Sequence, residues 1–115
     1  MKQIDGGVTA AKGFQAACTA AGIKYADRKD MAMLYSETPC RAAGVYTTNL
    51  VKAAPVKWDQ KGTAAGTAQA VVINARIANA CTGAEGPGYC LDTAKAAAQA
   101  PGPPAPSLPA RSTHA

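Results

Sequence analysis

The sequence predicts an α/β fold, and three segments carry that prediction. Residues 31–36 (MAMLYS) and 69–74 (QAVVIN) are short, largely apolar runs between polar or glycine-containing stretches, a pattern typical of strands. Residues 89–99 (YCLDTAKAAAQ) are rich in alanine, and Asp92 stands three residues before Lys95, which favours a helix. The length of 115 residues allows one such domain and not two.

The first half of the chain is expected to form strands and turns. The first 30 residues are rich in glycine and alanine and predict short extended pieces joined by turns. Residues 43–48 (AGVYTT) are β-branched and aromatic, and they predict a second strand that pairs antiparallel with 31–36. Within 49–58, Pro55 either ends a helix begun before it or opens a new short element.

The second half is expected to form a loop, a strand, an irregular segment and a helix. Residues 59–67 (DQKGTAAGT) are polar and interrupted by glycine, which predicts the loop. We place one structural unit at residues 1–99. Residues 100–115 (APGPPAPSLPARSTHA) hold five of the eight prolines and only one large aliphatic residue. They predict a disordered Pro-rich tail or a stretch translated out of frame, and the second interpretation is favoured.

The apolar content of the chain is dominated by alanine. There are 28 alanines, but leucine, isoleucine, valine and phenylalanine together number 15 of 115 residues. That share is below the roughly 20% at which chains begin to resemble those that build no core. Alanine buries little area, whereas each buried large aliphatic side chain contributes about 1.5–3 kcal/mol. We therefore expect a chain that does not fold robustly alone and is a piece of something larger.

Several functional classes are disfavoured by composition and spacing. The chain has no apolar run of membrane-spanning length and no signal-peptide pattern near its start, so we expect a cytoplasmic protein without a membrane partner. The net charge is +5, but the basic residues are scattered, which disfavours nucleic acid as a partner. The four cysteines lack metal-ligand spacing, so no metal is expected; we interpret them as reduced and mostly buried.

The segment 79–90 (NACTGAEGPGYC) is the one with chemical interest. Its glycines lie too far beyond the strand at 69–74, and in the wrong order, for a dinucleotide-binding turn. Gly83 has no Cβ, so a ligand can approach its backbone N–H, and the hydroxyl of Thr82 stands beside it. Two such donors can form an oxyanion hole, although Thr-Gly is also a common turn pair. From the residues alone, the ordinary turn is the favoured interpretation and the oxyanion hole the alternative.

Other candidate residues are better explained by structural roles. Tyr46 and Trp58 are interpreted as packing residues. Cys81 has no visible base or cation beside it in the sequence and is interpreted as structural. Residues 47–49 (TTN) could contact a substrate, but a turn or strand end is the favoured interpretation.

Four segments, taken together and in order, resemble the N-terminal part of the ornithine/glutamate N-acetyltransferase family of arginine biosynthesis. They are GGVTAAKGFQAA (6–17), RKDMAMLYSETP (28–39), AAGVYTTNLVKAAPV (42–56) and IANACTG (77–83). The resemblance covers about residues 1–99, and four blocks in one order make it specific.

The resemblance implies the N-terminal portion of a stacked-sheet α/β sandwich of the ornithine acetyltransferase type. It implies an acyltransferase that moves acetyl from N-acetylornithine to glutamate, and in bifunctional members also from acetyl-CoA, with no cofactor. Family precursors cleave themselves before an internal threonine, which becomes the nucleophile of a second chain. By resemblance, Thr82 and Gly83 form the oxyanion hole.

The chain also departs from the family pattern. Where the family usually reads NSGNANACTG, residues 74–83 read NARIANACTG, so Ala75, Arg76 and Ile77 replace Ser, Gly and Asn. The resemblance gives no counterpart here of the self-cleavage segment, the nucleophile, the main substrate-binding residues or the second chain. We therefore expect this chain to be inactive without the remaining α-chain and β-chain segments. The alternative is a non-catalytic interaction protein, such as a truncated paralogue that binds an intact acetyltransferase.

Overall fold

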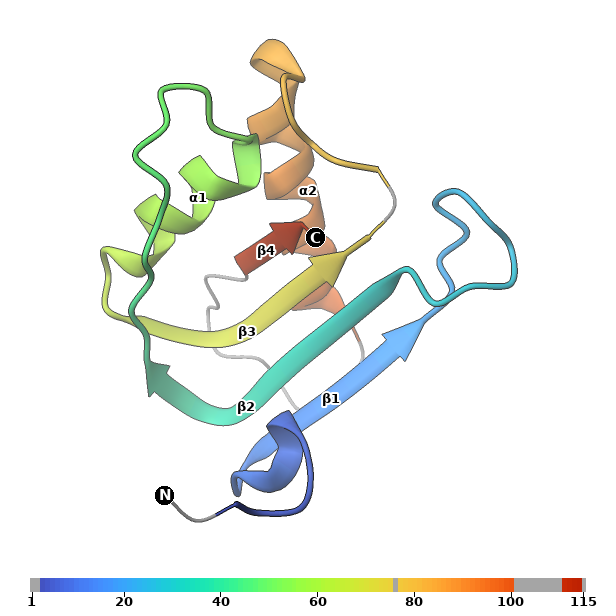
Figure 1. The fold of residues 1–115 in the computed structure, drawn as a ribbon, viewed down its shortest axis with the longest axis vertical. Coiled ribbons are helices and arrows are strands. Elements are labelled where there is room, and N and C mark those ends of the chain that lie inside the picture. Colours follow the sequence, from blue (N-terminus) through green and yellow to red (C-terminus); the bar gives the residue numbers. More distant parts are fainter. Residues whose placement is uncertain (1–2, 76, 101–110, 115) are drawn as a thin grey trace.

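The structure is a computed structural model that describes residues 3–75, 77–100 and 111–114, the last of these by their backbone. Two α-helices lie against a four-stranded sheet with strand order β1-β2-β3-β4 (Figure 1). The elements are η1 (Val8–Ala10), β1 (Phe14–Thr19), β2 (Met31–Arg41), α1 (Ala54–Thr63), β3 (Thr67–Asn74), η2 (Gly83–Glu85), α2 (Gly86–Gln99) and β4 (Arg111–His114). The predicted α/β class is confirmed.

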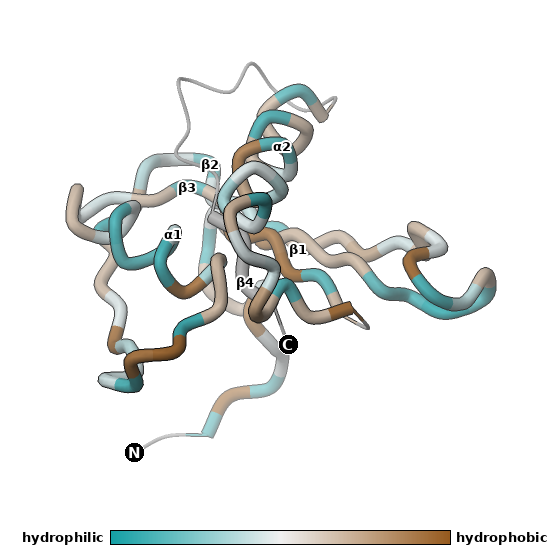
Figure 2. Tube along the Cα trace, turned by 90° about the horizontal axis from the view of Figure 1, so that it is seen from above, coloured by the Kyte–Doolittle hydropathy of each residue, from teal (hydrophilic) through white to brown (hydrophobic). Residues whose placement is uncertain are grey.

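Strands β1 and β2 form an antiparallel hairpin whose connection projects from the body of the molecule (Figures 1 and 2). Asp30 closes that connection. Its side chain is 3% exposed, and its two carboxylate oxygens accept the backbone N–H groups of Ala21 at 2.6 Å and Ile23 at 2.7 Å. Because a carboxylate binds amide donors strongly, this one side chain fixes an otherwise glycine- and alanine-rich loop.

Strand β2 is one of the two inner strands of the sheet, because both of its edges are paired. Its second partner is β3, also antiparallel, and the register shifts between Tyr35 and Cys40. Such a shift bends the longer strand and increases its twist. Strand β4 pairs parallel with the outer edge of β3.

The core between the helices and the sheet is small. Among the described residues, the buried apolar core consists of Ala70, Val72 and Cys90. Figure 2 shows that strongly hydrophobic stretches of the trace are short and separated. This agrees with the expectation of a small core from an alanine-rich composition.

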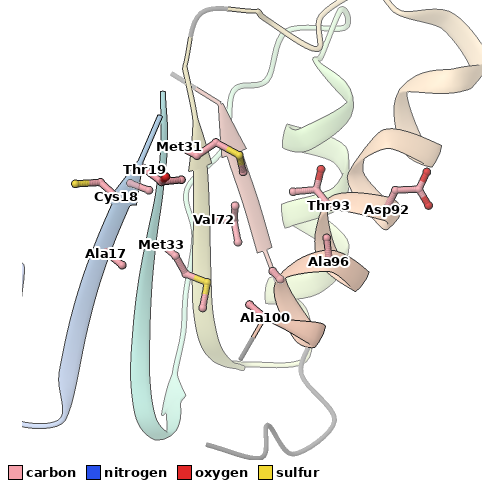
Figure 3. A pocket seen from close by; sticks show the side chains of 12 residues that line it. Ala17, Cys18, Thr19, Met31, Met33, Val72, Asp92, Thr93, Ala96 and Ala100 are labelled. Atoms are coloured by element: carbon pink, nitrogen blue, oxygen red, sulfur yellow. The ribbon is translucent and has the colours of Figure 1, made fainter. Parts of the chain in front are cut away.

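An apolar cavity of about 560 Å³ lies between the sheet and α2 (Figure 3). Met31, Met33 and Val72 line it from the sheet, and Thr93 and Ala97 from the helix. The short alanine side chains of α2 leave this space unfilled, and an unfilled space forfeits dispersion contacts along its walls.

Two predicted elements are wrong. Residues 43–48 form no strand, because β2, their predicted partner, is already paired along both of its edges. Residues 59–67 are not one loop: Pro55 opens α1, which continues to Thr63, and only 64–66 turn before β3. The strands at 31–36 and 69–74 and the helix at 89–99 are confirmed, each within a longer element.

The expected Pro-rich tail falls mainly on residues 101–110 and 115, which lie outside the described residues. Within it, Ala100 follows the end of α2, and Arg111–His114 form β4. For these four residues the expectation of a tail without secondary structure does not hold. The interpretation of the tail as out of frame stays a prediction.

Candidate functional site

A Cys-Thr-Gly turn connects the end of β3 to the start of α2 (Figure 1). Cys81 and Gly83 both have left-handed backbone angles, with φ of 57° and 64°. Glycine adopts this conformation freely, but for cysteine it carries strain, and strained backbone is frequent at functional sites. The turn thus places Thr82 between two residues of unusual geometry.

Asn79 fixes the orientation of Thr82. The side-chain Nδ2 of Asn79 donates to the carbonyl oxygen of Gly86 at 3.1 Å and to Sγ of Cys90 at 3.6 Å. These partners orient the amide, so its Oδ1 accepts the hydroxyl hydrogen of Thr82 at 2.5 Å. Asn79 is 7% exposed, and a buried amide with all these partners is a rigid support.

The start of α1 also joins this cluster. The backbone N–H of Ala54 donates to the carbonyl oxygen of Asn79 at 3.2 Å. Gly86 is buried, and a Cβ added there would lie 2.8 Å from Cβ of Ala54 and would overlap Oγ1 of Thr82. Glycine is therefore required for α1, α2 and the turn to meet at one point.

A cavity of about 220 Å³ opens beside the turn. Its lining combines Thr82 and Gly83 with two lysines and several apolar side chains. The lining residues are Leu50, Val51, Lys52, Ala54, Lys57, Cys81, Thr82, Gly83 and Pro87. No atom lies within 4 Å of the position of a Cβ at Gly83, so the backbone of the turn is accessible. The larger cavity of Figure 3 is lined by none of these residues.

The Cys90 thiol and the Tyr89 phenol, which lie near the turn, are both held in their neutral forms. Burial, followed by the negative charge of Asp59, raises the pKa of Cys90 above its ordinary value of 9.0, against a lowering by its hydrogen bond with Asn79. The hydroxyl of Tyr89 donates to Oε2 of Glu85 at 2.8 Å, and that bond raises the pKa of Tyr89. Burying a neutral thiol is cheap, whereas burying a thiolate is costly.

The predicted oxyanion pair, Thr82 and Gly83, lies together in one cavity, but the supporting residues were missed. Asn79, Gly86 and the two cavity lysines carry no motif of their own. Two features of the sequence could have pointed to the supporting residues: Asn79 stands three residues before Thr82, and Gly86 directly precedes Pro87 at a helix start.

The other sequence candidates take structural positions. The hydroxyl of Tyr46 lies 2.8 Å from Oγ1 of Thr63 and holds the 42–53 segment on α1. Thr47 and Asn49 accept backbone N–H groups two residues later in the chain, which confirms the turn interpretation. The prediction that the cysteines are mostly buried is wrong, since Cys90 alone of the four is buried.

The residues that depart from the family pattern lie at the end of β3. The backbone N–H of Ala75 donates to the carbonyl oxygen of Asp30 at 2.8 Å. Ile77 is exposed, and Arg76 lies outside the described residues.

The same fold occurs in solved acetyltransferase structures. The arginine biosynthesis bifunctional protein ArgJ of Bacillus halodurans superposes with a TM-score of 0.84 and 38% identity, over 95% of this chain and 56% of that one. The ornithine acetyltransferase of Mycobacterium tuberculosis, solved in complex with ornithine, gives a TM-score of 0.84 and 42% identity over 94% and 58%. This chain thus belongs to the class of α/β proteins that these two structures represent, and it has the fold of part of them.

Sequence comparison identifies the family. The ArgJ family profile matches residues 15–113. The arginine biosynthesis bifunctional protein ArgJ of Gloeobacter violaceus is 52% identical over 100 residues, and that of Symbiobacterium thermophilum is 53% identical over 104. The chain belongs to the ArgJ family of acetyltransferases, as the resemblance in the sequence implied.

The chain spans only part of these relatives. The matched region is 86% of this chain but 25% of the Gloeobacter protein, and 89% but 26% for the Symbiobacterium protein. Within the described residues, no helix has the length and apolar character needed to cross a bilayer.

Proposed function

We propose that this chain is the N-terminal fragment of a bifunctional glutamate N-acetyltransferase and ornithine acetyltransferase acting in the cytoplasm. The carrying observation is the Cys-Thr-Gly turn, whose Thr82 and Gly83 open onto a cavity in a chain of the ArgJ family. The substrates are N-acetylornithine as acetyl donor and glutamate as acceptor. Acetyl-CoA is a second donor, and no cofactor is required.

In this proposal Thr82 and Gly83 stabilise the oxyanion of the tetrahedral intermediate. A nucleophile that attacks the acetyl carbonyl transfers negative charge to its oxygen, and donors fixed before reaction stabilise that charge most effectively. The N–H of Gly83 is one donor. The hydroxyl of Thr82 is the other, and it must turn its hydrogen from Oδ1 of Asn79 toward the oxyanion.

The 115-residue chain is proposed to be inactive on its own. The threonine nucleophile, the main substrate-binding residues and the second chain belong to parts of the family protein without a counterpart here. An oxyanion hole without a nucleophile accelerates nothing. Activity therefore requires the remaining α-chain and β-chain segments as partners.

A chimera tests the proposal. Residues 1–99 replace the matching region of the Symbiobacterium relative, and acetyl transfer from N-acetylornithine to glutamate is measured. We expect an active chimera, no activity from the 115-residue chain, and a loss of about 10²–10³ in kcat with Thr82→Ala. Thr93→Ala, which removes a hydroxyl from α2, is the matched control. Activity in the isolated chain, or an unchanged kcat with Thr82→Ala, would refute the proposal.

One observation favours the alternative of an interaction protein. All six residues of β1 are exposed, and this strand is an edge of the sheet. An exposed edge is a template for pairing with another chain. Co-expression with an intact acetyltransferase would give a stoichiometric complex under this alternative and none under the fragment proposal.

A further inference from the structure

The cavity beside the Cys-Thr-Gly turn contains two cations that the proposed function does not use. Lys52 is half-buried just before α1, and Lys57 is exposed as the fourth residue of that helix. Among the residues that the structure describes, no carboxylate forms an ion pair with either lysine. Two like charges thus line one small space without a counterion from residues 3–75, 77–100 or 111–114.

The walls of the cavity combine these charges with apolar surface. Leu50, Val51 and Pro87 supply that surface and are themselves exposed, so an anion can reach both lysines from solvent. A lysine ammonium sits on a flexible four-carbon stem, so both groups can converge on one bound anion. A bound anion would also remove the repulsion between them.

The size of the cavity limits what can enter. Its volume of about 220 Å³ is below the roughly 300–1,000 Å³ of sites that enclose a drug-sized ligand. It suits a small anion or one charged end of a larger molecule. Such an end would lie next to Thr82 and to the accessible backbone of Gly83.

We propose that Lys52 and Lys57 form a binding site for a small oxyanion beside the Thr82–Gly83 turn. The inference rests on the proposed function for its ligand, which is the carboxylate of the amino-acid substrate. A carboxylate held by the two lysines orients the remainder of that substrate at the turn. Phosphate groups share this chemistry, and the experiment separates the two sources.

The test follows binding to the 115-residue chain by ¹H–¹⁵N NMR. Sodium glutamate, inorganic phosphate and coenzyme A are titrated separately at constant ionic strength. We expect glutamate to shift the amide signal of Gly83 saturably. Lys52→Gln and Lys57→Gln are each expected to weaken this binding about fivefold or more, since each removes a charge-assisted contact. Lys61→Gln, on the same helix but outside the cavity, is expected to leave it unchanged.

The outcomes are distinct. No saturable shift with any probe, or equal affinities in the wild type and both cavity variants, would overturn the site. Shifts with phosphate and coenzyme A but not with glutamate would overturn the assignment to a carboxylate. Since these titrations do not depend on acetyl transfer, an active chimera without an anion-dependent shift refutes only this inference. An inactive chimera with the shift retained refutes only the proposed function.

Discussion

Replacing Gly86 with alanine tests whether α1, α2 and the Cys-Thr-Gly turn are packed as tightly as the structure indicates. Gly86 has helical angles, with φ −52° and ψ −45°, so alanine needs no change of backbone. The new Cβ would lie 2.8 Å from Cβ of Ala54 and 3.2 Å from Oδ1 of Asn79, and would overlap Oγ1 of Thr82. Carbon atoms normally pack at about 3.5–4.0 Å, so α1 must move or the turn must open.

The expected cost follows from these contacts. Overpacking of a filled site costs about 1–3 kcal/mol. Rotation of Thr82 away from Asn79 loses a hydrogen bond worth about 0.5–1.5 kcal/mol. Alanine recovers at most about 1 kcal/mol through its helix propensity. We therefore expect Gly86→Ala to lower the free energy of unfolding by about 2 kcal/mol.

Gly88→Ala is the matched control, because it lies two residues further along the same helix with no atom within 4 Å of its added Cβ. There the helix propensity acts alone, and the free energy of unfolding should rise by up to about 1 kcal/mol. Urea unfolding followed by far-UV circular dichroism measures both variants, with an unchanged m-value as the condition for comparison. Equal stabilities of the two variants would refute the packing described at this point.

Three further outcomes are expected. Asp30→Asn should lower the free energy of unfolding by about 1–3 kcal/mol in the same urea assay, because two backbone amides lose a charged acceptor; an unchanged value would contradict the role of this side chain. The pKa of Cys90 is raised in the folded chain, so the folded chain keeps its thiol proton at a pH at which the unfolded chain loses it. The contribution of this thiol to the free energy of unfolding is therefore fully present below pH 9.0 and is lost as the pH rises above that value. Urea midpoints at rising pH should show this loss in the wild type and a smaller one in Cys90→Ala. Ala97→Leu should fill part of the cavity between α2 and the sheet and raise the free energy of unfolding by about 1 kcal/mol, whereas a decrease would indicate that the space is not available.

The parts of the fold that were predictable are those set by local pattern. The buried strand β3 and the alanine-rich helix α2 follow from apolar runs and helix propensity. Residues 43–48 have the composition of a strand, but their predicted partner β2 is paired along both edges with β1 and β3. A short element opened by Pro55 was one of two alternatives, and the extent of α1 to Thr63 was missed because Gly62 near its end suggested a loop.

The candidate site was predictable only in part for the same reason. Thr82 and Gly83 were found through adjacent residues and family resemblance. The role of Asn79 depends on Gly86, Cys90 and the start of α1, which only the folded chain brings together. The cavity lysines likewise meet the turn through tertiary structure, so spacing along the chain does not reveal them.

The contacts of Asn79 set the order in which this region can form during synthesis. The backbone carbonyl of Asn79 accepts a hydrogen bond from the start of α1, which is synthesised before it. Its side chain donates to Gly86 and Cys90, which the ribosome adds after it. The hairpin of β1 and β2 needs neither and can close first, because both of its strands precede α1 in the chain. The Thr82 hydroxyl thus reaches its final orientation only after Cys90 has left the exit tunnel and the first turns of α2 have docked. In a nascent chain, the β1–β2 hairpin can therefore form before the Cys-Thr-Gly turn takes its final geometry.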